Sequence, residues 1–265
     1  MIGLDARQRT YRLVEDIIDE GLQRWGEQPQ NAWKAIYSAL LWYEPVGGGV
    51  SLPHIIDSDK LKPQRSIWRQ RAQQVNDYLA VAFGCAPHEL PKYVDRLMKN
   101  PDYRGLQRQN PLGDGLIGAI AHVLTKFGDA NLKHQKEVIA NTLFPNIRIP
   151  GRSRTPKIDV ASMRGGHLVA ITSCKWSLRH DRIGDISVEC PAYKQAALNS
   201  LGRNIKFFVV TNEFDPSRLV RVLANECIDA VVHIHKPLVT QVLGLDNRLQ
   251  GLWDLTDYIL SSREW

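Results

Sequence analysis

KIDVASMRGGHLVAITSCK, residues 157–175, is the stretch that decides the fold. Two runs rich in apolar residues flank Gly165 and Gly166, a pattern that predicts two antiparallel strands joined by a tight turn. Such a hairpin carries Asp159 on its first strand and Lys175 near the end of its second. We therefore expect a carboxylate and an ammonium group to converge at one edge of a sheet.

Downstream of the hairpin, helical and strand patterns alternate. A helix is expected from about 188 to 201, with Ser187 as its N-cap, Pro191 in its first turn and Gly202 as its stop. Strand, helix, strand and helix patterns then follow in IKFFVVTNE, PSRLVRVLANE, CIDAVVHIH and the C-terminal segment. This alternation predicts an α/β protein with a mixed sheet.

Upstream of the hairpin, the chain has helical periodicity. Apolar residues recur at helical spacing, and Asp5 is a suitable N-cap for the first helix. The expected helices cover residues 6–25, 30–43, 66–83, 88–99, 115–127 and 131–144. A turn-rich stretch at 110–115 suggests a boundary. We expect a helical N-terminal domain at 1–110, for dimerisation or DNA-backbone contacts, and a catalytic and DNA-recognition domain at 111–265.

The bulk composition permits a polyanionic partner without establishing one. The 265-residue chain has a formal net charge of +6, and its 43% hydrophobic and 23% charged residues are ordinary for a soluble globular protein. No apolar run approaches the roughly 20 residues of a membrane helix, and the N-terminus lacks a signal-peptide core. These features predict a cytoplasmic protein.

The cysteines and histidines offer little sign of a metal centre. Cys85, Cys174, Cys190 and Cys227 form no CxxC pair, so we expect free thiols rather than a zinc site. His233 and His235 would share one face of a strand. A metal pair there is less probable than ordinary histidines, because no third ligand is evident.

The hairpin's acid and lysine suit phosphodiester hydrolysis. A carboxylate can hold Mg²⁺, and a lysine can stabilise the negative charge that develops on phosphate. Ser173 shares a strand face with Lys175, at a position where an acid would be an obvious ligand, and Glu189 is the next acidic candidate. Taken alone, Asp159 and Lys175 would more often be a surface ion pair, and Glu189 could equally be a first-turn helix acid.

The run SCKWSLRHDRIGDISVE, residues 173–189, resembles the signature of the CCGG family of Type II restriction endonucleases, which have the PD-(D/E)xK nuclease core. In that family, the acid normally found two residues before the lysine is displaced to the next helix. The resemblance covers about 155–226 and implies a restriction-endonuclease-like mixed β-sheet core flanked by helices. The residues that match the family's register are Asp159, Ser173, Lys175, Arg179, Asp181, Arg182 and Glu189.

The resemblance implies a role for each matching residue. Asp159 and Glu189 would bind Mg²⁺, and Lys175 would be the catalytic lysine. Ser173 would occupy the position two residues before the lysine, where related nucleases outside this family have an acid. Arg179 and Arg182 would each read a guanine, and Asp181 would read a cytosine. Base-edge chemistry agrees, because arginine forks to guanine O6 and N7 and a carboxylate accepts from cytosine N4. The competing interpretation is a solvated turn with internal ion pairs.

The family also uses a glutamate upstream of the aspartate. Glu137 is the best candidate, on the helix expected over 131–144, and Glu89 is the fallback. The alternative for Glu137 is an ordinary exposed helix residue paired with Lys133.

The sequence thus predicts a Type II restriction endonuclease. It would cut double-stranded DNA at a palindrome with a central CCGG and leave 5′ overhangs. A homodimer, or a higher oligomer, would match the palindrome's two-fold axis. A prokaryotic host would also carry a cognate DNA methyltransferase. Three alternatives remain open: a repair or recombination nuclease of the same fold, a non-catalytic DNA-binding protein, and a structural or interaction protein.

Overall fold

A computed structural model describes residues 5–44, 49–50, 65–104, 111–151, 156–244 and 247–265. The chain divides into two compact units, one of Met1–Ala119 with Pro237–Asp246 and one of Ile120–Lys236 with Asn247–Trp265. The predicted boundary after residue 110 falls at the end of a segment outside the described residues, so it stays a prediction.

The first unit is mainly helical. Two very short strands, β1 (Tyr43–Glu44) and β2 (Gly49–Val50), pair antiparallel within it. The α6 helix (Pro111–Phe127) contains residues of both units, and most of α10 (Lys236–Leu243) belongs to the first. Its other elements are α1 (Ala6–Trp25), η1 (Pro29–Asn31), α2 (Ala32–Leu40), α3 (Arg65–Phe83), η3 (Pro87–Lys92), α4 (Arg96–Lys99) and α5 (Pro101–Arg104).

The α1 helix shows how local sequence determines this unit. The Asp5 carboxylate accepts hydrogen bonds from the backbone N–H groups of Arg7 and Gln8, and the Gln8 side chain accepts from the Asp5 N–H, which completes a capping box. The apolar stripe of α1 is buried. At Gly21, an added Cβ would lie 3.0 Å from the Cα of Ala35, so the glycine allows α1 and α2 to approach closely.

The second unit is built on one six-stranded mixed sheet in the order β3-β4-β5-β6-β7-β8. The pairs from β3 to β5 are antiparallel, and those from β5 to β8 are parallel. The strands are β3 (Leu132–Ile139), β4 (Lys157–Arg164), β5 (His167–Lys175), β6 (Lys206–Thr211), β7 (Ala230–His233) and β8 (Leu252–Asp254). The predicted α/β class, with a mixed sheet flanked by helices and a helical N-terminal region, is confirmed.

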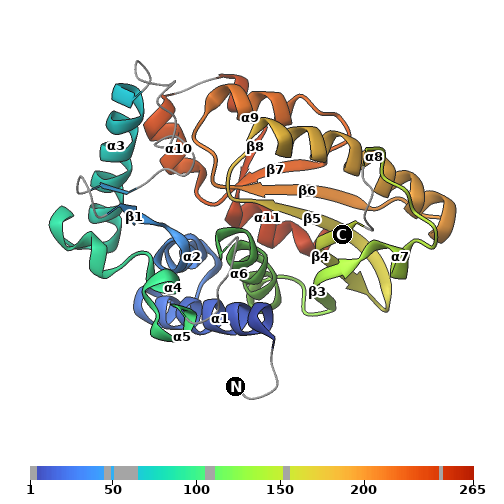
Figure 1. Cartoon of the computed structure of the whole chain (residues 1–265), viewed down its shortest axis with the longest axis horizontal. Helices are drawn as coiled ribbons and strands as arrows, with labels where there is room; N and C mark the ends of the chain where they lie inside the picture. Colours follow the sequence, from blue (N-terminus) through green and yellow to red (C-terminus); the bar gives the residue numbers. More distant parts are fainter. Residues whose placement is uncertain (1–4, 45–48, 51–64, 105–110, 152–155, 245–246) are drawn as a thin grey trace. The chain divides into compact units, whose positions relative to one another are not determined.

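Helices lie on both sides of this sheet. In Figure 1, α8 (His180–Leu201) and α9 (Pro216–Leu223) run on one side of the strands, and α11 (Leu255–Ser261) runs on the other. The remaining short elements of the unit are α7 (Ala140–Leu143), η4 (Asn247–Leu249) and η5 (Ser262–Glu264). Within the described residues, no helix is long and apolar enough to cross a membrane.

The predicted hairpin is confirmed as β4 and β5. Arg164 pairs with His167 across the turn, where Gly165 and Gly166 have φ values of 57° and 84°. Both values lie in the left-handed region that a two-residue hairpin turn requires and that glycine adopts without strain. On its other side, β5 pairs in parallel with β6, so this strand joins the antiparallel and parallel halves of the sheet.

The helix predicted over 131–144 is wrong. Residues 132–139 form β3, which pairs with β4 from Leu132↔Arg164 to Ile139↔Lys157, and only the single turn α7 follows. Pairing with an edge of the sheet outweighs local helix propensity here. Glu137 is therefore on a strand, with φ at 51°.

The helix predicted from 188 begins earlier, at His180, with Arg179 at the N-cap position. Glu189 therefore lies in the third turn rather than the first, and Pro191 lies inside the helix. Gly202 ends it in the left-handed conformation, as predicted.

The helix predicted over 88–99 is divided into η3 and α4, because Pro91 and the positive φ of Asp95 interrupt it.

The expectation of four free thiols is also wrong. Cys190 on α8 and Cys227 lie with their Cα atoms 6.1 Å apart and form a disulfide, while Cys85 and Cys174 are free.

One buried hydrogen bond attaches α11 to β5. The hydroxyl groups of Tyr258 and Thr172 lie 2.6 Å apart, and both side chains are fully buried. We expect Tyr258→Phe to lower the free energy of unfolding by about 1–3 kcal/mol, because the Thr172 hydroxyl loses its partner without access to water. Chemical denaturation measures the loss. Adding Thr172→Val should recover part of it, and an unchanged Tyr258→Phe protein would contradict the assigned bond.

Candidate active site

An ion pair lies where β4 and β5 run side by side. The Asp159 Oδ2 atom accepts hydrogen bonds from the Lys175 Nζ at 2.6 Å and from the Cys174 backbone N–H at 2.8 Å. The two charged side chains are only 18% and 13% exposed, so this pair is not a solvated surface contact. Both contacts use one carboxylate oxygen, and within the described residues Oδ1 accepts no hydrogen bond.

The register of β4 and β5 explains why Asp159 and Lys175 lie close together. Val160 pairs with Thr172, so Asp159 lies at the level of Ser173 on the neighbouring strand. Directly opposed residues of an antiparallel pair share a face, and Ser173 shares its face with Lys175 because side chains alternate along β5. The Ser173 hydroxyl is buried and has no hydrogen-bond partner among the described residues.

A second carboxylate acts on the same lysine. Glu189 on α8 is 6% exposed. Burial alone would lower the pKa of Lys175, but the negative charges of Asp159 and Glu189 outweigh it and raise that pKa above its ordinary value. Lys175 is therefore an ammonium ion at neutral pH, suited to stabilising negative charge rather than to removing a proton.

The neighbouring thiol is chemically passive. Burial raises the pKa of Cys174 well above its ordinary value, and the nearby Asp159 carboxylate raises it further. Because the thiolate is the reactive form of cysteine, this residue is a poor nucleophile. The chemistry of the site therefore rests on its carboxylates and its ammonium group.

The donor set fits a divalent cation that also contacts a phosphate. Mg²⁺ usually keeps several waters and binds one or two carboxylates together with substrate phosphate oxygens. Asp159 and Glu189 supply two carboxylates, and the partnerless Ser173 hydroxyl lies on the same strand face as Lys175. Among the described residues, no group of three or more His, Cys, Asp or Glu side chains forms an all-protein metal site.

The predicted base-reading residues lie at the start of α8. Arg179 is at the N-cap position, and Asp181 and Arg182 are in the first turn. The Asp181 Oδ2 atom lies 3.0 Å from the Arg179 Nη2 and 3.9 Å from the Arg182 Nε. These side chains are 38–60% exposed, so their polar groups are accessible from solvent.

Sequence reasoning missed Glu213, which follows β6 and is 3% exposed. Its Oε2 accepts hydrogen bonds from the Leu178 backbone N–H at 2.8 Å and from the Arg218 Nη1 at 3.3 Å. Its Oε1 accepts from the backbone N–H groups of Phe214 and Asp215 at 3.0 and 2.9 Å. The available signal was a glutamate two residues after an apolar strand, where burial is costly unless donors surround it.

The segment between β5 and α8 has a further attachment to β6. The Asn212 backbone N–H donates to the Trp176 carbonyl oxygen at 3.0 Å. Together with the Leu178 contact, this bond fixes both ends of residues 176–178 to the residues that follow β6. The start of α8 is therefore anchored to the sheet.

The two upstream glutamate candidates have different positions. The pairs Lys136↔Val160 and Val138↔Ile158 flank Glu137, so it lies on β3 at the level of Asp159. Glu89 belongs to the first unit and accepts hydrogen bonds from Lys92 and from the Ala86 N–H, which lower its pKa. Glu89 thus has a local role at the start of η3.

The two histidines near the end of β7 contact each other. The His235 backbone N–H donates to the His233 Nδ1 at 3.0 Å, and the His235 Nδ1 lies 3.7 Å from the Asp254 Oδ2. Burial lowers the pKa of His233 to about 3, so this side chain is neutral.

No family model matches the chain, and no curated protein does. Among solved structures, it is similar to the restriction endonuclease PspGI in a complex with substrate DNA, at 13% identity and a TM-score of 0.39, covering 93% of this chain and 90% of that one. It is also similar to metal-depleted Ecl18kI with uncleaved, modified DNA, at 11% identity and a TM-score of 0.35, covering 95% and 83%. At these TM-scores the likeness supports no conclusion about what this chain does.

Proposed function

We propose that this chain is a Type II restriction endonuclease. It cuts double-stranded DNA at a palindromic site with a central CCGG, by Mg²⁺-dependent phosphodiester hydrolysis that leaves 5′ overhangs. The observation that carries the proposal is the buried contact between Asp159 and Lys175, with Glu189 close enough to raise the lysine pKa. The α8 helix that carries Glu189 also presents the exposed Arg179, Asp181 and Arg182.

Each residue of the buried cluster has a distinct task. Asp159 and Glu189 would hold Mg²⁺, which when bound supplies charge for the phosphate and acidity for a water molecule. Lys175 stays protonated and stabilises the negative charge that builds on the phosphate oxygens during attack. Ser173 offers a hydroxyl on the same strand face. Glu137, at the level of Asp159, is a further carboxylate for this site.

The exposed cluster reads the bases. Arg179 and Arg182 each fork to the O6 and N7 atoms of a guanine, and Asp181 accepts from a cytosine N4 amino group. In the free protein these groups pair with one another at the surface. Exposed ion pairs contribute little stability, so exchanging them for base edges costs little.

The palindrome implies how the chain assembles. Two identical subunits related by a two-fold axis match its symmetry most simply, so we propose a homodimer or a higher oligomer built from it. The same proposal implies a host methyltransferase that protects the recognition site, without direct contact to this chain.

We expect Lys175→Ala to abolish cutting while specific DNA binding survives. The variant removes the ammonium group that stabilises the transition state, and losses of roughly 10²–10³-fold or more are typical for such groups. Plasmid cleavage with Mg²⁺ measures the first property, and gel shifts without a metal ion measure the second. Lys206→Ala, at an exposed lysine elsewhere on the sheet, is the matched control. Cutting by Lys175→Ala at the wild-type rate would refute the active site.

We expect Arg182→Ala to lose preference for CCGG. Each lost bidentate base contact costs about 1–3 kcal/mol of discrimination. The measurement is a digest of DNA of known sequence with Mg²⁺, followed by sequencing of all the ends, which also reports the flanking bases and the overhang. The exposed Arg203→Ala is the control of equal charge. An Arg182→Ala enzyme that selects sites as the wild type does would overturn the assignment of base readers.

A further inference from the structure

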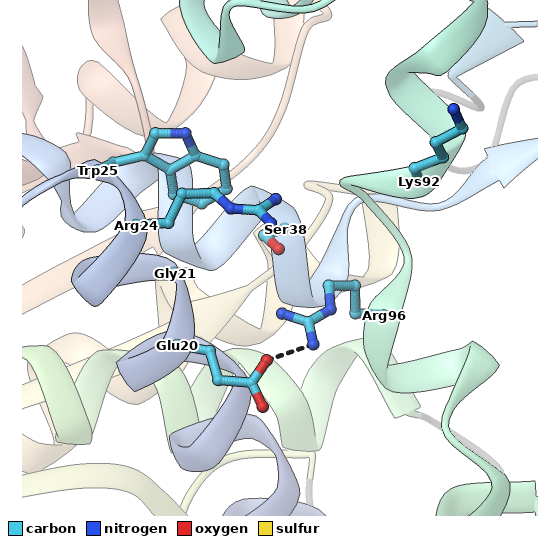
Figure 2. A pocket seen from close by; sticks show the side chains of 7 residues that line it. All are labelled: Glu20, Gly21, Arg24, Trp25, Ser38, Lys92 and Arg96. Carbon is cyan, nitrogen blue, oxygen red and sulfur yellow. Dashed lines mark hydrogen bonds and ion pairs between the residues drawn. The ribbon is translucent and has the colours of Figure 1, made fainter.

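The first unit contains a basic pocket of about 300 Å³ (Figure 2). It lies among α1, α2, η3 and α4, and none of its lining residues belongs to the proposed nuclease site. The residues that line it are Glu20, Gly21, Arg24, Trp25, Ser38, Lys92 and Arg96.

Positive charge in this pocket is only partly compensated. Arg96 pairs with Glu20, and Lys92 pairs with Glu89 at 3.2 Å. The Arg24 guanidinium instead lies 5.1 Å from the ring centre of Tyr93 and 6.0 Å from that of Trp25, and no ion pair of the described residues includes it. Arg24 is thus a cation beside two aromatic rings that has no anionic partner in the part of the chain that the structure describes.

A buried hydroxyl faces the same pocket. Ser38 is 1% exposed, and no hydrogen bond to its side chain occurs in the described part of the chain. In Figure 2 the Ser38 hydroxyl lies between the guanidinium groups of Arg24 and Arg96. Because Ser38 lines the pocket, its hydroxyl can donate a hydrogen bond to a ligand oxygen.

We propose that this pocket binds a phosphate monoester. Two guanidinium groups and a hydroxyl match the oxygens of a tetrahedral dianion, and arginine suits phosphate because its fork engages two oxygens at once. The volume is at the lower end for small-molecule sites, roughly 300–1,000 Å³. A mononucleotide or the 5′-phosphate at a DNA end fits this size and charge, whereas the side of an intact duplex is too broad to enter a pocket.

Glu20 provides a second test of the proposal, because its negative carboxylate would repel an anion bound in the pocket. Removing that charge should strengthen phosphate binding, and removing Arg24 should weaken it. A general loss of folding cannot raise phosphate affinity in one variant and lower it in the other when both substituted residues line the same pocket. The pair Glu20→Gln and Arg24→Ala therefore separates a binding site from a structural cluster.

The experiment is a calorimetric titration of the full chain at constant ionic strength. Its probes are inorganic phosphate, deoxyadenosine 5′-monophosphate, and a short duplex with or without 5′-phosphates. We expect saturable phosphate binding that weakens at least about tenfold in Arg24→Ala, weakens in Ser38→Ala and strengthens in Glu20→Gln. Arg12→Ala, on the same helix but 64% exposed and outside the pocket, should bind as the wild type does.

The probes separate the two sources of the monoester. Binding of the mononucleotide indicates a small-molecule ligand, and binding of the phosphorylated duplex alone indicates a DNA end; either outcome supports the site. The proposal is overturned if no probe binds saturably, or if Arg24→Ala and Glu20→Gln both bind as the wild type does.

A second inference rests on the proposed function and concerns Glu213. The Glu213 carboxylate receives four donors, one of them the N–H of Leu178, the residue before Arg179. We infer that Glu213 is a positioning residue that holds the start of α8 in register with the bases. Glu213→Gln preserves size but replaces one accepting oxygen with an amide nitrogen, which cannot accept from an N–H group.

We expect Glu213→Gln to reduce the ratio of cleavage at the cognate site to cleavage at a one-base mismatch by about tenfold. The rate at saturating cognate DNA should change less, because Asp159 and Lys175 lie on β4 and β5, and Glu189 lies in the third turn of α8, eleven residues beyond Leu178. Asp229→Asn is the matched control, since Asp229 also links α8 to β6, through Lys194 and the Phe207 N–H, but away from the reading residues. Its selectivity should be that of the wild type.

The outcomes separate this inference from the proposed function. A wild-type chain that cuts no DNA refutes the function itself. If the wild-type chain cuts selectively and the Glu213→Gln variant has the same selectivity, only the positioning role is refuted. Equal losses of selectivity in Glu213→Gln and Asp229→Asn would likewise assign Glu213 a merely structural role.

Discussion

The register between β4 and β5 is the constraint on which the site depends. Because Val160 pairs with Thr172, Asp159 lies beside the strand face that carries Ser173 and Lys175. A slip of one residue would turn the carboxylate to the opposite face of the sheet. The turn itself sets a register in which Arg164 pairs with His167, and an irregularity between Ser162 and Met163 shifts the pairing by one residue before it reaches Val160. The position of Asp159 relative to Lys175 therefore depends on this irregularity as well as on the hairpin turn.

Burial gives the cluster its electrostatic character. A buried lysine alone would tend to lose its proton, and a buried carboxylate alone would tend to gain one. Here the negative charges of two carboxylates act on one ammonium group, and the lysine remains charged. The two carboxylates and the ammonium group lie in a poorly solvated place, where a divalent cation would have acidic ligands. The pair formed by Arg164 and Asp129 differs, because it joins one carboxylate to one guanidinium group.

The sequence predicts those parts of the fold that local patterns determine. The first helix follows from the Asp5 cap and its apolar stripe, and the hairpin follows from two β-rich runs around Gly165 and Gly166. The strand β3 could not be foreseen, because its pairing with β4 depends on residues about 25 positions away. The early start of α8 was also hidden, because Arg179 at the N-cap position makes no side-chain cap. The role of Glu213 appears only when the ends of β5 and β6 are placed together.

In the proposed nuclease, the extended α8 helix would carry both a base-reading residue and a metal-binding residue, which the shorter predicted helix could not. Arg182 and Glu189 are seven residues apart on one helix. Seven residues turn an ideal helix by nearly two full turns and advance it by about 10 Å, so both side chains leave the same side of the helix. That advance corresponds to roughly three base-pair steps of duplex DNA. A helix starting at 188 would have left Arg182 on a loop, with no fixed distance to Glu189. With both residues on one helix, the spacing between the proposed base reader and the proposed metal ligand is fixed, and inserting one residue between them would rotate Arg182 by about 100° relative to Glu189.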